Sequence, residues 1–144
     1  MSSINKKIIV TGGAGFIGGR LVDFFLKKNF SVMNIDKLTY AASISEIKKF
    51  SNYSKYFFVK TDINNSKLIK KVFHDFKPHA VFHLAAESHV DRSIKNSLAF
   101  IKTNIVGTYS LLNNSLEYFK KNKKKKFCFY SRFYRRSIWR LQYV

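Results

Sequence analysis

Short apolar runs alternate with amphipathic stretches along most of this chain of 144 residues. Compact apolar runs are typical of buried strands, and they predict strands near residues 7–11, 32–35, 56–60, 80–84 and 127–130. Apolar positions with helical spacing predict helices between them, near residues 16–28, 43–50, 66–76 and 98–122. Strands that alternate with helices form parallel sheets with right-handed crossovers. The pattern therefore predicts an α/β fold, a Rossmann-type doubly wound parallel sheet that is truncated after about five strands.

A glycine-rich loop, T-G-G-A-G-F-I-G, follows the first predicted strand. After a buried strand, this spacing allows a tight turn, a close approach of the backbone to a pyrophosphate, and close packing of the next helix. A phosphate would accept hydrogen bonds from free backbone N–H groups where a helix begins near Phe16. Glycines also mark ordinary turns, so the loop alone leaves a simple turn open.

A carboxylate follows the second predicted strand. Asp36 lies 18 residues after Gly18, where a dinucleotide fold places an acidic side chain against the adenosine ribose. Such a carboxylate accepts hydrogen bonds from both ribose hydroxyls and repels a 2′-phosphate, which favours NAD over NADP; the neighbouring Lys37 weakens this preference. Asp36 could instead cap a loop, but the strand, the glycine loop and the carboxylate occur in register.

Length and composition limit the class of protein. The chain has the length of one domain, and its single cysteine, Cys128, allows no internal disulfide, which favours a reducing compartment. The N-terminal residues lack the apolar region of a secretory signal. No apolar run approaches the roughly 18 residues of a membrane span. We therefore expect a cytoplasmic protein without a membrane partner.

Two longer strings resemble a known family. Asp36 opens the string D-K-L-T-Y-A, and His83 opens the string H-L-A-A-E-S-H-V-D-R-S-I. With the glycine loop, they resemble the extended short-chain dehydrogenase/reductase superfamily and, within it, the dTDP-glucose 4,6-dehydratase family. The resemblance covers nearly all of the first 119 residues. Gly19 and Ala42 depart from it, since the family more often carries Ser and Gly there.

The resemblance implies a site for NAD at matching positions. The implied NAD-binding residues are Gly12, Gly15, Phe16, Ile17, Gly18, Asp36, Lys37, Leu38, Thr39, Asp62, Ile63, Leu84, Ala85, Ala86, Glu87, Ser88 and Thr103. Ser88 would also reach the sugar nucleotide, dTDP-glucose. Simpler roles stay open for single residues, such as core packing for Leu84 and Ile63 and a loop cap for Asp62. Full-length relatives are implied to be homodimers that pair through helices, including the one near residues 98–122.

The implied reaction is the NAD-dependent dehydration of dTDP-glucose to dTDP-4-keto-6-deoxy-glucose, a lyase step in deoxysugar biosynthesis. The family's catalytic segments, a Thr-Asp-Glu string and a helical Tyr-x-x-x-Lys turn, are not found, so no catalytic residue is assigned. Tyr56 and Lys60 have the second spacing, but on a predicted strand four residues span about 13 Å instead of a helical turn of about 5.4 Å. We expect no dehydratase turnover, and weak or no NAD binding, from these 144 residues. The dispersed histidines, His74, His79, His83 and His89, do not suggest a metal site.

The tail after the lysine run at residues 123–126 departs from the family. Its codons can be chosen so that, read one base later, they give F-V-F-I-H-V-S-T-D-E-V-Y-G-D-F-N, which contains the missing Thr-Asp-Glu string. The hypothesis is an inserted base near the lysine run. Residues 1–126 would then be an incomplete NAD-binding domain, residues 127–144 an out-of-frame tail, and the substrate domain absent. A DNA read across this region, with an intact mass of the protein, tests the hypothesis.

The charge and the missing chemistry leave two alternatives open. The formal net charge is +19, and residues 120–144 hold ten lysines and arginines and no acid. This basic, aromatic tail could bind nucleic acid without sequence preference. Out-of-frame translation of an A-rich gene accounts for the same residues, so nucleic acid is not the partner we expect. The second alternative is an NAD-binding module without catalysis.

Overall fold

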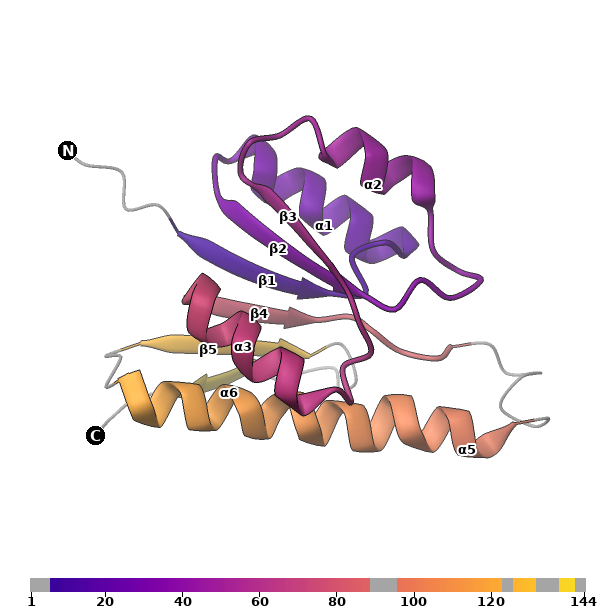
Figure 1. Ribbon diagram of the computed structural model, residues 1–144, viewed down its shortest axis with the longest axis vertical. Helices are drawn as coiled ribbons and strands as arrows, with labels where there is room; N and C mark the ends of the chain where they lie inside the picture. The colour runs from indigo at the N-terminus through magenta and orange to yellow at the C-terminus, as the bar shows by residue number, and fades with distance from the viewer. Residues whose placement is uncertain (1–5, 89–95, 123–125, 132–137, 142–144) are drawn as a thin grey trace.

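One six-stranded sheet forms the centre of the fold (Figure 1). The computed structural model describes residues 6–88, 96–122, 126–131 and 138–141. The strands are β1 (Lys7–Thr11), β2 (Ser31–Asp36), β3 (Tyr56–Lys60), β4 (Ala80–His83), β5 (Phe127–Ser131) and β6 (Ile138–Leu141), in the order β3-β2-β1-β4-β5-β6. The first five strands are parallel, and β6 pairs antiparallel with β5.

Helices cover both faces of the sheet (Figure 1). One face carries α1 (Phe16–Lys27) and α2 (Ile44–Phe50), and the other carries α3 (Ser66–Phe76) and α6 (Thr108–Asn122). Helix α6 continues without a break from α5 (Ser97–Phe100) and the π-helical segment η1 (Ile101–Gly107). This two-sided arrangement around parallel strands confirms the predicted doubly wound α/β fold.

The alternation of side chains along β1 shows why both faces are covered. Ile8 and Val10 are buried against Phe25 of α1, whereas Ile9 is buried in the core that contains Phe73 of α3. Successive side chains on a strand point to opposite faces, so a run of apolar residues needs a helix on each side. The continuous apolar runs that predicted the strands are therefore a direct consequence of burial on both faces.

Three details differ from the prediction. The sheet has a sixth strand, because β6 pairs with the free backbone groups at the edge of β5. Strand β4 ends at His83 instead of Leu84, whose N–H donates to the carbonyl oxygen of Thr11. The helix predicted over residues 98–122 begins at Ser97 and includes the π-helical segment. Apolar periodicity does not distinguish a π-turn from an α-turn, and β6 lies in sequence without a marked strand pattern.

Candidate functional site

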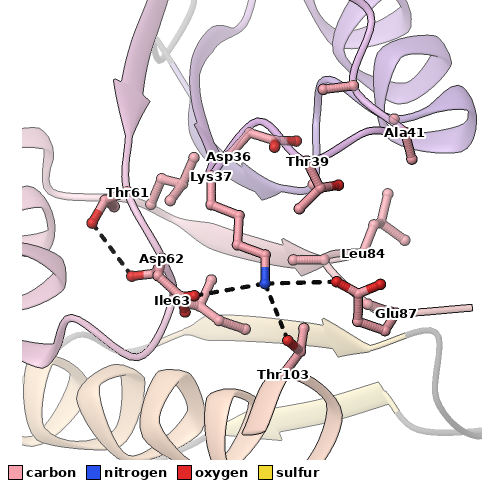
Figure 2. A pocket seen from close by; sticks show the side chains of 16 residues that line it. Asp36, Lys37, Thr39, Ala41, Thr61, Asp62, Ile63, Leu84, Glu87 and Thr103 are labelled. Atoms are coloured by element: carbon pink, nitrogen blue, oxygen red, sulfur yellow. Dashed lines mark hydrogen bonds and ion pairs between the residues drawn. The ribbon is translucent and has the colours of Figure 1, made fainter. Parts of the chain in front are cut away.

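The carboxyl ends of β1 to β4 meet at one edge of the sheet and surround a cavity of about 100 Å³, the main cavity (Figure 2). It lies where the strand order reverses on either side of β1, the position at which doubly wound sheets bind ligands. Its sixteen lining residues are Gly12, Gly15, Ile35, Asp36, Lys37, Thr39, Ala41, Ala42, Thr61, Asp62, Ile63, Leu84, Ala85, Ala86, Glu87 and Thr103.

The glycine loop is packed too tightly for side chains. Gly12 has φ of 73°, and a Cβ added there would lie 2.7 Å from the backbone nitrogen of Ala85. A Cβ on Gly18 would collide with the carbonyl oxygen of Gly12. Gly12 is therefore in direct backbone contact with Ala85 on one side and with Gly18 of α1 on the other, and the N–H groups of Gly12 and Gly15 donate to the carbonyl oxygens of Ile35 and Gly12. This geometry fits the turn and packing roles that the spacing predicted.

Asp36, the last residue of β2, is fixed by two backbone N–H groups. Its Oδ2 accepts from the N–H of Ala14 at 3.0 Å, and its Oδ1 accepts from the N–H of Leu38 at 2.8 Å. Leu38 has φ of 60°, a left-handed conformation that is rare for a branched apolar residue and is often found at functional sites. Asp36 thus caps its own loop and also presents a half-buried carboxylate to the main cavity.

Lys37 crosses the middle of the main cavity (Figure 2). Its Nζ lies 3.2 Å from Thr103 Oγ1, 3.7 Å from Asp62 Oδ2 and 3.7 Å from Glu87 Oε1. Two carboxylates thus lie near one ammonium group, and the carboxylate of Asp36 is a third on the cavity wall. This excess of negative charge favours hydroxyl groups over phosphate groups as ligand partners at this part of the wall.

The part of the cavity wall that follows β4, residues 84–87, is held in place through its backbone. The N–H of Ala85 donates to Thr11 Oγ1 at 3.3 Å. The amide of Asn104 accepts from the N–H of Glu87 at 2.9 Å and donates to the carbonyl oxygen of Glu87 at 2.9 Å. Asn104 lies in η1 beside Thr103, and π-helical segments occur frequently at functional sites. Residues from two separate elements, β1 and η1, therefore set the position of one cavity wall.

Most of the residues that the resemblance implied lie together on this cavity. Twelve of them line it, namely Gly12, Gly15, Asp36, Lys37, Thr39, Asp62, Ile63, Leu84, Ala85, Ala86, Glu87 and Thr103. Five others do not line it, namely Phe16, Ile17, Gly18, Leu38 and Ser88. Gly18 is buried beneath the loop, and Phe16 is 83% exposed at the start of α1. Ser88 lies on a neighbouring hollow of about 490 Å³, beside Phe100.

Four lining residues were missed by the sequence analysis, namely Ile35, Ala41, Ala42 and Thr61. Ile35 lies directly before Asp36, and Thr61 lies directly before Asp62, so each is next to an expected residue. Ala41 is the last residue of the string D-K-L-T-Y-A, and this string was the sequence signal that could have identified this part of the wall. The methyl side chains of the two alanines carry no chemical signature, which is why sequence reasoning did not select Ala41 and Ala42.

The other candidate side chains have structural partners. Tyr56 and Lys60 both lie on β3, which confirms that they form no helical pair, and Tyr56 OH accepts from the amide of Asn34 at 2.9 Å. His74 is exposed and contacts Asp75, while His79 Nδ1 accepts from the N–H of Lys7 at 3.1 Å. His89 lies outside the described residues. In the described part of the chain, no three His, Cys, Asp or Glu side chains gather as metal ligands.

The model of the family described as GDP-mannose 4,6 dehydratase matches residues 9–132. The chain therefore belongs to this family of nucleotide-sugar enzymes, which confirms the predicted resemblance. Among its curated relatives is the dTDP-glucose 4,6-dehydratase of Salmonella typhimurium, which is 48% identical over an alignment of 128 residues that covers 86% of this chain and 36% of the relative. The chain thus spans about a third of the length of that relative.

Solved structures agree with this family in fold. The dTDP-glucose 4,6-dehydratase of Streptomyces venezuelae, solved with NAD bound, has a TM-score of 0.72 and 35% identity, over 78% of this chain and 36% of that one. A UDP-glucose 4-epimerase of Thermotoga maritima, solved with UDP-glucose, has a TM-score of 0.73 and 32% identity, over 85% and 37%. Within the described residues, no helix is long and apolar enough to cross a membrane.

Proposed function

We propose that the main cavity binds the adenosine part of NAD. The observation that carries the proposal is the Asp36 carboxylate, which is held at the end of β2 directly across from the glycine loop. Its two hydrogen bonds come from backbone N–H groups, so the remaining lone pairs of both oxygens can accept from ribose hydroxyls. The backbone of Gly12 and Gly15 lies on the cavity wall, where no side chain blocks a pyrophosphate.

The proposed reaction is the dehydration of dTDP-glucose, the activity in the names of the curated relatives. When bound, NAD would accept a hydride from the sugar and return it after water has left. The residues of this chain would bind and orient the cofactor, and Ser88 in the neighbouring hollow would contact the sugar nucleotide. The sequence contains neither the Thr-Asp-Glu string nor a helical Tyr-x-x-x-Lys turn, so we expect no turnover from these 144 residues. A cytoplasmic location is part of the same proposal.

Replacing Asp36 with asparagine tests the cofactor site. The variant removes the charge that strengthens hydrogen bonds to ribose, and such bonds contribute about 1.5–3 kcal/mol each. We expect NAD and ADP-ribose to bind at least about tenfold more weakly, which corresponds to about 1.4 kcal/mol. The preference for NAD over NADP is expected to fall as well. NMR titration of the 144-residue chain measures both affinities, even where binding is weak.

Asp75→Asn is the matched control, because Asp75 is exposed on α3 and does not line the main cavity. It changes the net charge by the same amount and is expected to leave the NAD affinity unchanged. An equal loss in both variants would show a general charge effect, and an unchanged affinity in Asp36→Asn would contradict the proposed ribose contact.

The same proposal includes pairing of two copies through the long helix. Large apolar side chains are exposed along one stripe of α5, η1 and α6: Leu98 is 58% exposed, Ile105 is 64% exposed and Tyr109 is 69% exposed. Ile105 and Tyr109 lie four residues apart, about one helical turn, so these two side chains lie on one helix face. Contiguous exposed apolar residues of this kind mark interaction surfaces.

Replacing Ile105 with aspartate is expected to weaken self-association about a hundredfold, roughly 3 kcal/mol, because a charge would be buried in the contact. Sedimentation velocity over a range of concentrations measures the effect. Phe24→Asp is the control, since Phe24 is 53% exposed on α1, away from the stripe. A monomeric wild-type chain, or equal association of both variants and the wild type, would contradict pairing through this stripe.

A further inference from the structure

His83 is a buried titratable residue that takes part in none of the proposed cofactor contacts. It ends β4 with only 1% of its surface exposed. Its Nδ1 lies 2.8 Å from Thr11 Oγ1 on β1, and its Nε2 lies 2.8 Å from Thr108 Oγ1, the first residue of α6. One imidazole ring therefore links three elements that surround the main cavity.

The hydrogen bonds around the ring determine where its proton lies. Thr108 Oγ1 donates its only proton to the carbonyl oxygen of Asn104 at 2.7 Å, so towards His83 it can only accept. Nε2 must then carry the proton. Burial lowers the pKa of His83 to about 4, so the ring is neutral near pH 7 and Nδ1 carries none. Nδ1 therefore accepts from the hydroxyl of Thr11.

This assignment gives one continuous, directed chain of hydrogen bonds. The N–H of Ala85 donates to Thr11 Oγ1, which donates to His83, and His83 donates to Thr108, which donates to Asn104. This chain of hydrogen bonds begins at Ala85 and ends at Asn104. Ala85 belongs to the cavity wall, and the side chain of Asn104 holds the wall at Glu87, so the two ends anchor the two parts of the wall. Reversal of any hydroxyl would leave a buried donor or acceptor without a partner, which costs about 1–3 kcal/mol.

We propose that His83 is a positioning residue of the main cavity: as the neutral Nε2–H tautomer, it orients Thr11 and Thr108 and so fixes the wall from Leu84 to Glu87. The wall has little freedom, because the backbone of Ala85 lies against Gly12 with no space for a Cβ between them. A displaced wall would also move the carboxylate of Glu87 away from Lys37. The consequence for cofactor affinity rests on the proposed function, whereas the tautomer and the fixed wall do not.

The first test is spectroscopic and needs no ligand. Long-range ¹H–¹⁵N correlation on the ¹⁵N-labelled 144-residue chain distinguishes a protonated from a bare ring nitrogen. For His83 we expect a protonated Nε2 and a bare Nδ1, with no change between pH 8 and pH 6. In Thr108→Val, which lacks the fixed acceptor, the same signals are expected to shift. The opposite tautomer, averaged signals in the wild type, or unchanged signals in Thr108→Val would overturn the proposal.

The second test measures the wall itself by amide hydrogen exchange. His83→Phe keeps a ring of similar size and loses both hydrogen bonds, so exchange at Ala85 is expected to accelerate at least tenfold more than exchange in the β1 core. His83→Gln offers a side-chain N–H to Thr108 and is expected to restore protection at Glu87 but not at Ala85. Val22→Ala, buried on the opposite face, is the control for a general loss of stability. Equal acceleration in His83→Phe and Val22→Ala would overturn the proposal.

Two further variants keep the test decisive if His83→Phe does not fold. Thr11→Val is expected to expose Ala85 to exchange, and Thr108→Val to expose Glu87, because each variant removes one link of the hydrogen-bond chain. NAD titration is the last arm, with about a tenfold weaker affinity expected for His83→Phe. If the wild type binds no NAD, the proposed function fails, while the imidazole signals and the exchange rates still decide the role of His83.

Discussion

Replacing Gly12 with valine is expected to abolish NAD binding and to lower the free energy of unfolding by about 2–5 kcal/mol. The left-handed φ of 73° costs a residue with a Cβ about 1–2 kcal/mol. The added Cβ would lie 2.7 Å from the nitrogen and 2.8 Å from the Cα of Ala85, and overpacking of this kind typically costs about 1–3 kcal/mol more. Both contacts are with backbone, so the strain pushes the cavity wall itself. Denaturant unfolding and NAD titration measure the two effects.

Gly19→Ala is the control, at a glycine in α1 shortly after the loop. A Cβ at Gly19 meets nothing closer than 3.7 Å, and the residue lies inside α1, where alanine is favoured over glycine. We expect this variant to raise the free energy of unfolding by about 0.5–1 kcal/mol and to keep the NAD affinity. Wild-type stability and NAD affinity in Gly12→Val would show that the loop does not pack as described.

The contrast between these glycines shows what a sequence pattern can and cannot specify. The spacing of Gly12, Gly15 and Gly18 after a strand predicted the loop and its position, because only a few backbone paths join a buried strand to a helix in this way. The same letters do not reveal which glycine faces Ala85. That contact joins residues 73 positions apart in the sequence and depends on the position of β4 beside β1.

The site was predicted in a similarly uneven way. Asp36 was predicted as a cavity residue because it follows an apolar strand. In the structure it lines the cavity and also caps its own loop. Lys37 was expected at the NAD site and as a residue that weakens the preference for NAD, but the contacts of its ammonium with Asp62, Glu87 and Thr103 were not predicted. These partners come from three other elements, and long flexible side chains leave no periodic signal. His83 was set aside because the histidines are dispersed in the sequence, and its two hydroxyl partners became evident only in the structure.

The tail after residue 126 was predicted least well. The strand near residues 127–130 is confirmed, but β6 was not expected, and side-chain periodicity cannot show which backbone groups pair at a sheet edge. Both reading frames considered for the tail begin with phenylalanine at the first and third positions, as F-C-F-Y-S or as F-V-F-I-H. The alternation that buries β5 is therefore the same in either frame. The inserted-base hypothesis stays a prediction, and a DNA read across the lysine run decides it.

Replacing Phe127 with alanine is expected to lower the free energy of unfolding by about 3–5 kcal/mol, the usual cost of deleting a fully buried aromatic ring. Phe127 has no exposed surface, and its ring centroid lies 5.7 Å from that of Tyr118 and 6.5 Å from that of Phe73. The ring thus fills the space between β5, α6 and α3. Denaturant unfolding of the purified chain measures the loss.

Phe24→Ala is the control for this variant, because Phe24 is 53% exposed and its loss is expected to cost no more than about 0.5 kcal/mol. A cost below about 1 kcal/mol for Phe127→Ala would mean that β5 adds little to the core and that β4 is the effective edge of the sheet. A cost in the expected range would mean that β5 supports β4 from one side as β1 does from the other. In that case the wall from Leu84 to Glu87 is held by a strand with neighbours on both edges, and the main cavity depends on residues beyond the lysine run.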